Sequence, residues 1–192
     1  TFVNNTANFY GGGAIFTTSY GNVTVSGSTF VNNTANSYGG GAIYTTYNGN
    51  VTVSGSTFVN NTARYGGAIY TSSSSNFNVS GSTFVNNTAG YGGGAIYTSS
   101  GNVNVSGSTF VNNTAKQYGG AIYTTFTGNV NVSGSTFVNN TAQFGGAIST
   151  SSSNVNVSGS TFVNNTANSY GGAIYTTFTG NVTVSGSTFV NN

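Results

Sequence analysis

The stretch that decides the fold is Asn22-Val23-Thr24-Val25-Ser26-Gly27-Ser28-Thr29-Phe30-Val31-Asn32-Asn33-Thr34. Its Thr-Phe-Val-Asn-Asn segment also opens the chain at Thr1 and closes it at Asn192. The copies start at Thr1, Thr29, Thr57, Thr83, Thr109, Thr136, Thr161 and Thr188, with spacings of 28, 28, 26, 26, 27, 25 and 27 residues. A fixed period of this length is typical of solenoids and propellers. Residues 1–192 are therefore predicted to form a single repeat domain, a section of a longer array or filament.

Two short β-strands meet at a bend within the quoted stretch. Residues 22–26 alternate polar and apolar side chains, which predicts that Val23 and Val25 face a core while Thr24 faces out. Gly27 breaks this strand and permits a bend. Residues 28–31 then form a second strand with Phe30 inward, and the Asn-Asn pair ends it at a corner, because Asn tolerates turn dihedral angles.

The third predicted strand is Gly40-Gly41-Ala42-Ile43-Tyr44-Thr45, with Ile43 inward and with Ala42 and Tyr44 outward. Nothing in the chain has the 3.6-residue periodicity of a helix. Three short strands and three bends in 25–28 residues make one coil of a parallel β-helix. The prediction is an all-β fold, a parallel β-solenoid of about seven coils with three short strands per coil.

Stacked coils turn each position into a file of equivalent residues spaced about 4.8 Å apart. The predicted core files begin at Phe2, at Ile15, and at Val23 with Val25. A buried file of amides is predicted to bond from coil to coil without charge. Its members are Asn5, Asn33, Asn61, Asn87, Asn113, Asn140, Asn165 and Asn192.

The composition excludes most chemistry. The chain has no Asp, Glu, His or Cys, and Arg64 and Lys116 are its only charged side chains. General acid–base catalysis and metal binding need groups of the missing kinds, so no enzyme activity, catalytic residue, metal or cofactor is expected. A net charge of +2 gives no footprint for nucleic acid. No apolar run approaches the roughly 18 residues of a membrane span, so no membrane insertion by this segment is expected.

A recurring pair of motifs carries a family resemblance. Phe30-Val31-Asn32-Asn33-Thr34-Ala35 is followed by Gly40-Gly41-Ala42-Ile43, and the pair recurs in each unit over the whole chain. It resembles the repeats of chlamydial polymorphic membrane proteins and of similar adhesin-like β-helix proteins of bacteria and archaea. The resemblance implies a right-handed parallel β-helix that is displayed outside the cell, in adhesion or in a surface structure. The expected location is therefore extracellular or at the cell surface.

Aromatic residues form two files. The residues after Ile are predicted to make a surface aromatic stripe, which comprises Tyr44, Tyr70, Tyr97, Tyr123 and Tyr175, with Phe16 at its start and Ser149 interrupting it. A second file precedes Gly-Gly and comprises Tyr10, Tyr38, Tyr65, Tyr91, Tyr118, Phe144 and Tyr170. One interpretation is stacking between coils within the chain. The other is a sticky surface for a glycan, a sister filament or a host surface.

Glycosylation sequons occur twice per coil. The Asn-Asn-Thr class has its acceptors at Asn4, Asn32, Asn60, Asn86, Asn112, Asn139 and Asn164. The Asn-Val-Thr and Asn-Val-Ser class has its acceptors at Asn22, Asn50, Asn78, Asn104, Asn131, Asn156 and Asn181. Chance is the alternative, because outward positions in a chain rich in Ser, Thr and Asn generate sequons on their own.

These features favour a non-enzymatic extracellular structural protein, a section of a cell-surface fibre or adhesin stalk that assembles with itself, head to tail or laterally. Near-zero net charge and the lack of Pro, helix or terminal charge favour stacking at the open end coils. Glycans or a host or neighbour cell surface are further expected partners. The alternative is a binding module that uses one flat face for ice or glycan. Asn interrupts the outward file of that face, which comprises Thr24, Thr52, Asn78, Asn104, Asn131, Asn156 and Thr183.

Overall fold

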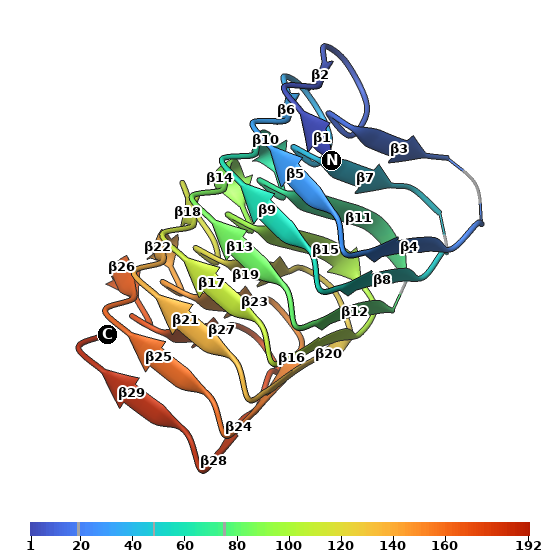
Figure 1. Cartoon of the computed structure of the whole chain (residues 1–192). Helices are drawn as coiled ribbons and strands as arrows, with labels where there is room; N and C mark the ends of the chain where they lie inside the picture. Colours follow the sequence, from blue (N-terminus) through green and yellow to red (C-terminus); the bar gives the residue numbers. More distant parts are fainter. Residues whose placement is uncertain (19, 48, 75) are drawn as a thin grey trace.

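The chain winds into a stack of coils whose strands lie side by side along one axis (Figure 1). The computed structural model describes residues 1–18, 20–47, 49–74 and 76–192. Every regular element in those residues is a β-strand, and all strand pairs are parallel. The predicted all-β solenoid is confirmed.

Four sheets run the length of the stack, and each is named here by its inward residue. The Phe sheet comprises β1 (Phe2–Val3), β5 (Thr29–Val31), β9 (Thr57–Val59), β13 (Thr83–Val85), β17 (Thr109–Val111), β21 (Thr136–Val138), β25 (Thr161–Val163) and β29 (Thr188–Val190). The Ala sheet comprises β2 (Thr6–Ala7), β6 (Thr34–Ala35), β10 (Thr62–Tyr65), β14 (Thr88–Gly92), β18 (Thr114–Ala115), β22 (Thr141–Phe144) and β26 (Thr166–Tyr170).

The other two sheets close the coil. The Ile sheet comprises β3 (Ile15–Thr17), β7 (Ile43–Thr45), β11 (Ile69–Ser74), β15 (Ile96–Ser100), β19 (Ile122–Thr124), β23 (Ile148–Thr150) and β27 (Ile174–Thr176). The Val sheet comprises β4 (Val23–Ser26), β8 (Val51–Ser54), β12 (Phe77–Ser80), β16 (Val103–Ser106), β20 (Asn129–Ser133), β24 (Asn154–Ser158) and β28 (Val182–Ser185).

The prediction of three strands per coil is wrong, because the Ala sheet is a fourth. In the second coil it consists of Thr34–Ala35 alone, and two residues are too short to show a period-two pattern. Ala35 is nevertheless buried and pairs with Ala7 of the preceding coil. The corner at Asn32-Asn33 therefore leads into another strand instead of a loop.

Equivalent residues of successive coils lie opposite one another, as predicted. Phe30 pairs with Phe58, and their rings stack with centroids 4.7 Å apart and planes 1° apart. The core contains the Phe, Ile and Val files without a break from coil to coil. Fully burying each such side chain stabilises the fold by about 1.5–3 kcal/mol before entropy is counted.

Ala42 was predicted to point outward, and the structure shows that this is wrong. Ala42 is fully buried and belongs to the same core as Ile43. The backbone amides of both residues donate to one carbonyl, that of Ala68, at 2.8 and 3.0 Å. Two consecutive amides aimed at one acceptor break the regular strand pattern, so the side chains do not alternate here.

The predicted amide ladder is confirmed. Asn87 Nδ2 donates to Asn113 Oδ1 at 3.0 Å, and Asn113 Nδ2 donates to Asn140 Oδ1 at 3.0 Å. The same Nδ2 of Asn113 also donates to the carbonyl of Phe84. One side chain therefore bonds to both the preceding and the following coil. These residues are fully buried, so each amide is satisfied without a charge in the core.

The corner between the Val and Phe sheets has the same length in every coil because two devices fix it. Gly27 has φ +51°, in the left-handed region that glycine adopts without strain. Ser28 Oγ then donates to the carbonyl of Ser26 at 2.9 Å, and the amide of Ser28 donates to Ser56 Oγ of the next coil at 3.1 Å. A serine ladder, which was not predicted from the sequence, therefore supports this corner.

Removing a buried hydroxyl is expected to stabilise the protein. Thr17, Thr45, Thr71 and Thr98 bury hydroxyls that have no protein hydrogen-bond partner among the described residues. Because an unpaired buried hydroxyl is costly, Thr71→Val should raise the free energy of unfolding by about 1 kcal/mol. Thermal denaturation measures the effect. Thr150→Val is the control, since the Thr150 hydroxyl donates to the carbonyl of Ser153 at 3.2 Å and its loss should not stabilise. A lower melting temperature for Thr71→Val would contradict this account.

Candidate functional site

The outer face of the Val sheet presents only neutral polar groups. Alternation along each strand buries the two Val positions and turns the residues between and after them toward solvent. The outward residues form two parallel files. The middle file is Thr24, Thr52, Asn78, Asn104, Asn131, Asn156 and Thr183, and the serine file is Ser26, Ser54, Ser80, Ser106, Ser133, Ser158 and Ser185.

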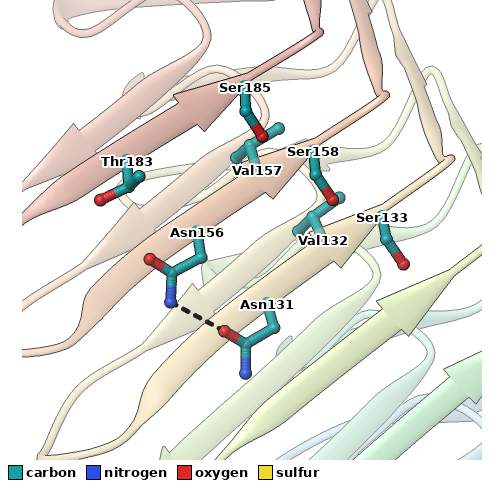
Figure 2. Close-up of a pocket in the computed structure, with 8 residues that line it drawn as sticks. All are labelled: Asn131, Val132, Ser133, Asn156, Val157, Ser158, Thr183 and Ser185. Carbon is teal, nitrogen blue, oxygen red and sulfur yellow. Dashed lines mark hydrogen bonds between the residues drawn. The ribbon is translucent and has the colours of Figure 1, made fainter.

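A shallow hollow of about 240 Å³ lies on this face over β20, β24 and β28. Figure 2 shows Asn131, Asn156 and Thr183 in one line and Ser133, Ser158 and Ser185 in another. Val132 and Val157 lie between the two lines, but their side chains belong to the core and are each only 2% exposed. The hollow therefore offers amides and hydroxyls, and its lining residues carry no group that titrates near neutral pH.

The amides of the middle file bond to one another first. Asn156 Nδ2 donates to Asn131 Oδ1 at 2.9 Å (Figure 2). Asn131 Nδ2 in turn donates to Asn104 Oδ1 at 2.9 Å. Asn104 Nδ2 continues the ladder to Asn78 Oδ1 at 2.9 Å. Asn104 and Asn131, which both donate and accept in the ladder, each keep one N–H and one lone pair for an outside partner.

A second amide file, exposed or half-buried, lies at the start of the Val strands, and it was not predicted from the sequence. It comprises Asn22, Asn50, Asn76, Asn102, Asn129, Asn154 and Asn181. Its side chains accept from the next coil's backbone, as in Asn50 N to Asn22 Oδ1 at 3.0 Å. An Asn in the same place of every unit was the available signal.

The two sequon classes lie in different surroundings. Asn-Asn-Thr acceptors such as Asn32 have φ near +54° and exposed side chains, while the following Asn33 fills the buried ladder. The acceptors Asn104, Asn131 and Asn156 use their Nδ2 atoms in the ladder of the middle file. Asn22, Asn50 and Asn181 belong to the second amide file at the strand starts and are themselves exposed.

The predicted surface aromatic stripe is not a surface. Tyr44, Tyr70, Tyr97 and Tyr123 point away from the main core but are only 2–7% exposed. The second aromatic file covers them, through Tyr38, Tyr65, Tyr91 and Tyr118. The prediction of surface exposure is therefore wrong for Tyr44, Tyr70, Tyr97 and Tyr123, which are buried, and holds only in part for Tyr175, which has intermediate exposure.

The covered file is called the inner file and the covering one the outer file. Inner-file rings stack in parallel, with Tyr70 and Tyr97 centroids 4.8 Å apart and planes 9° apart. Outer-file rings contact them in two ways: Tyr38 meets Tyr70 edge-on at 63°, while Tyr118 stacks on Tyr123 at 13°. This is the stacking interpretation of the aromatic residues, and each such pair adds about 0.5–1.5 kcal/mol.

One family is recognised from the sequence. A family model described as a right-handed beta helix region matches residues 1–119 and 91–192, which together span the chain. The chain belongs to the right-handed β-helix family. No curated protein and no solved structure matches this β-helix. The finer resemblance to chlamydial polymorphic membrane proteins stays a hypothesis.

Burial changes the acidity of the tyrosines of this β-helix. Desolvation raises the pKa of Tyr44, Tyr70, Tyr97 and Tyr123, because the charged phenolate is disfavoured away from water. Hydroxyls lie near the buried phenols, as Ser99 Oγ does at 3.3 Å from the Tyr70 oxygen. These phenols therefore remain protonated at neutral pH and do not serve as bases.

The two aromatic files border a solvent-exposed hollow at the first two coils of the β-helix. This hollow has a volume of about 480 Å³ and is lined by Tyr10, Phe16, Tyr44 and Tyr47 together with Thr18, Thr46 and Ser72. Ring faces and hydroxyls of this kind suit the face of a sugar ring or of a flat aromatic ring.

In the ranges that the structure describes, no helix is long and apolar enough to span a membrane.

Proposed function

We propose that this β-helix is a non-enzymatic extracellular structural protein, a section of a cell-surface fibre or adhesin stalk. One observation carries the proposal: nearly the same cross-section recurs in every coil, with equivalent residues in register. A structure that changes so little along its axis is suited to set a distance. The fold alone does not decide this, because function depends on the site and not on the fold.

The side chains support the same proposal. The chain offers no Asp, Glu, His or Cys to act as a general acid, base, nucleophile or metal ligand. Its buried Asn side chains hydrogen-bond to one another in a ladder between coils, as Asn87, Asn113 and Asn140 do. The two hollows described above are lined by amides, hydroxyls and rings, which are groups suited to binding.

Self-association, head to tail or lateral, is part of the proposal. Val184 and Phe189 are 46% and 40% exposed in the last coil, while their equivalents Val157 and Phe162 are buried. The next coil of a longer chain, or a second copy, would cover them. A net charge of +2 opposes neither arrangement.

Electron microscopy of the concentrated protein tests this assembly. Continuous fibres with an axial repeat that is a multiple of about 4.8 Å are expected. Val184→Lys should prevent them, because it places a charge on the apolar end surface. Thr183→Lys is the matched control on the outward side of the same strand and should leave fibres intact. Monodisperse single rods at every concentration would contradict self-association.

A binding role for the Val-sheet face is the second candidate function. The hollow in Figure 2 favours a glycan, because amide N–H groups and hydroxyls line it and can bond to sugar hydroxyls. Ice binding is less well supported, since Asn replaces Thr in the middle file from Asn78 to Asn156. A glycan array and a thermal-hysteresis assay separate these two roles. Specific retention of one glycan, lost in Asn156→Ala, would support binding over a purely structural role.

Glycosylation also remains a proposal. The exposed Asn-Asn-Thr acceptors, such as Asn32 and Asn112, offer free side chains at a turn, which favours them over Asn104 and Asn131. Intact mass of the protein from its natural source is expected to exceed the mass of the bare chain by whole glycans. A mass equal to the bare chain would reject glycosylation.

A further inference from the structure

Tyrosine is the residue of this chain that a one-electron oxidant would attack. The sequence contains 13 Tyr but no Cys, Met, Trp or His, so the usual competing sites of oxidation are missing. All tyrosines but Tyr20 and Tyr47 belong to the inner and outer files. One-electron oxidation of this protein is therefore expected mainly at tyrosines of the inner and outer files.

The inner file is poorly placed to form a new bond. Four of its rings are 2–7% exposed and lie face to face, with planes 7–9° apart between neighbours: Tyr44, Tyr70, Tyr97 and Tyr123. Two phenols couple through ring carbons, which requires one edge to approach the other. Rings locked in parallel by close packing cannot make that approach without leaving the core.

The outer file has the geometry that the inner file lacks. Its tyrosines are at least partly exposed, and neighbouring rings are tilted by 42° for Tyr10 and Tyr38, 53° for Tyr38 and Tyr65, and 59° for Tyr65 and Tyr91. Their centroids are 5.5, 4.7 and 5.4 Å apart in the same order. Tyr91 and Tyr118 continue the file at 5.6 Å and 61°.

We propose that the outer file is an oxidative cross-linking site, where tyrosines of successive coils are joined as o,o′-dityrosine. The oxidant is hydrogen peroxide used by a haem peroxidase. Tyr38 and Tyr65, for example, each lose one electron and the phenolic proton, and the two radicals join through ring carbons ortho to oxygen. The two displaced ring hydrogens move to the oxygens and restore both phenols. One peroxide takes up two electrons and two protons and becomes two waters.

Such cross-links would fasten one coil to the next. Tyr38 and Tyr65 are 27 residues apart, and Tyr65 and Tyr91 are 26 residues apart. A covalent bond across a loop of this length limits the unfolded chain more than the folded one, as a disulfide does. The chain has no Cys with which to achieve this by another route.

The test compares three proteins that all carry Tyr20→Phe, which removes the exposed pair Tyr20 and Tyr47. The parent has no other change. The outer variant replaces Tyr38, Tyr65, Tyr91 and Tyr118 by Phe, and the inner variant replaces Tyr44, Tyr70, Tyr97 and Tyr123 by Phe. Both variants should fold, because the chain itself has Phe144 in the outer file and Phe16 in the inner file. Circular dichroism and melting temperature check this before oxidation.

Each protein is treated with haem peroxidase and hydrogen peroxide at low protein concentration, and dityrosine is measured by fluorescence and by mass spectrometry of peptides. The parent and the inner variant are expected to form dityrosine, to remain monomers on a denaturing gel and to melt at a higher temperature after treatment. The outer variant is expected to lose the dityrosine signal. The proposal is overturned if the parent forms none, if the outer variant keeps the signal, if the inner variant loses it equally, or if cross-links form only between molecules.

Discussion

Gly94→Ala is expected to lower the free energy of unfolding by about 3 kcal/mol or more, the scale of severe overpacking. Gly94 precedes Ala95 at the corner that leads into β15. A Cβ built on Gly94 would overlap the carbonyl oxygen of Gly120 in the next coil and lie 2.7 Å from the amide nitrogen of Thr114. Both atoms are backbone, so no side chain can rotate away.

The coils themselves would have to separate to make room for that methyl group. Gly94 N donates to the carbonyl of Gly119 at 3.1 Å, and Ala95 N donates to that of Ala121 at 2.9 Å. Separation weakens both bonds and opens the core beneath them. The same overlap recurs at Gly41, Gly67 and Gly120, which explains why every unit keeps a Gly before its Ala.

Gly107→Ala is the matched control for this prediction. A Cβ on Gly107 meets nothing within 4 Å, so the only penalty comes from its φ of +52°. That conformation costs an L-residue about 1–2 kcal/mol. Chemical denaturation of the two variants compares a backbone collision with a dihedral cost. Equal losses in Gly94→Ala and Gly107→Ala would show that close approach at the Gly-Gly corner does not set the spacing of the coils.

Asn113→Asp is expected to be the other severe change, and its effect should depend on pH. Asn113 Nδ2 donates to the carbonyl of Phe84 and to Asn140 Oδ1, both at 3.0 Å. An Asp places a second carboxylate oxygen against these two acceptors, in a fully buried position. Leaving a buried charge facing acceptors costs several kcal/mol, so much of the stability should be lost at pH 7.

The sign of the pH dependence follows from the folded-state pKa. Burial and the two facing acceptors favour the protonated Asp, so its pKa in the folded protein rises above the unfolded value of about 3.9. The stability of Asn113→Asp should therefore be greatest below about pH 4 and fall as the pH rises toward the folded pKa. Thermal denaturation from pH 3 to pH 8 measures this.

The neighbouring Asn112→Asp is the control for the ladder. Asn112 is exposed and has φ +54°, a conformation that Asp also tolerates. Its stability should change by less than about 0.5 kcal/mol and should show no gain at acid pH. If Asn112→Asp and Asn113→Asp behaved alike, the alternation between an exposed and a buried Asn would be wrong.

The repeat pattern of the sequence was enough to predict the core files and the amide ladder. It was not enough to predict features that depend on contacts between neighbouring segments. The Phe file and the amide ladder follow from period and polarity, and Phe30 and Asn33 lie where the sequence placed them. The direction of Tyr44 away from the main core was also right. Its burial was not predictable from its own strand, because Tyr38 covers it from a loop of variable length.

Two other misses have local causes. The strand Thr34–Ala35 is too short for any periodic signal, and its pairing depends on the coil before it. Ala42 faces the core because the amides of Ala42 and Ile43 both donate to the carbonyl of Ala68. No residue type in this segment predicts such a bend. The hollow over β20, β24 and β28 depends on how three coils align, which one unit of sequence does not contain.

The proposed structural role requires the coils to be interchangeable units of a rod. Deleting residues 83–108 removes one unit and joins Ser82 to Thr109, the same Ser-Thr junction that every unit has. Ser26→Cys and Ser158→Cys provide two exposed sites in one file for spin labels, and the chain has no other Cys.

The distance between the two labels, measured by double electron–electron resonance before and after the deletion, tests this claim most directly. Five coil steps separate the labels in the full chain, so about 24 Å is expected, and four steps should give about 19 Å. The shortened protein should also keep its cooperative melting. An unchanged distance, or a chain that no longer folds once a single unit is removed, would contradict the account.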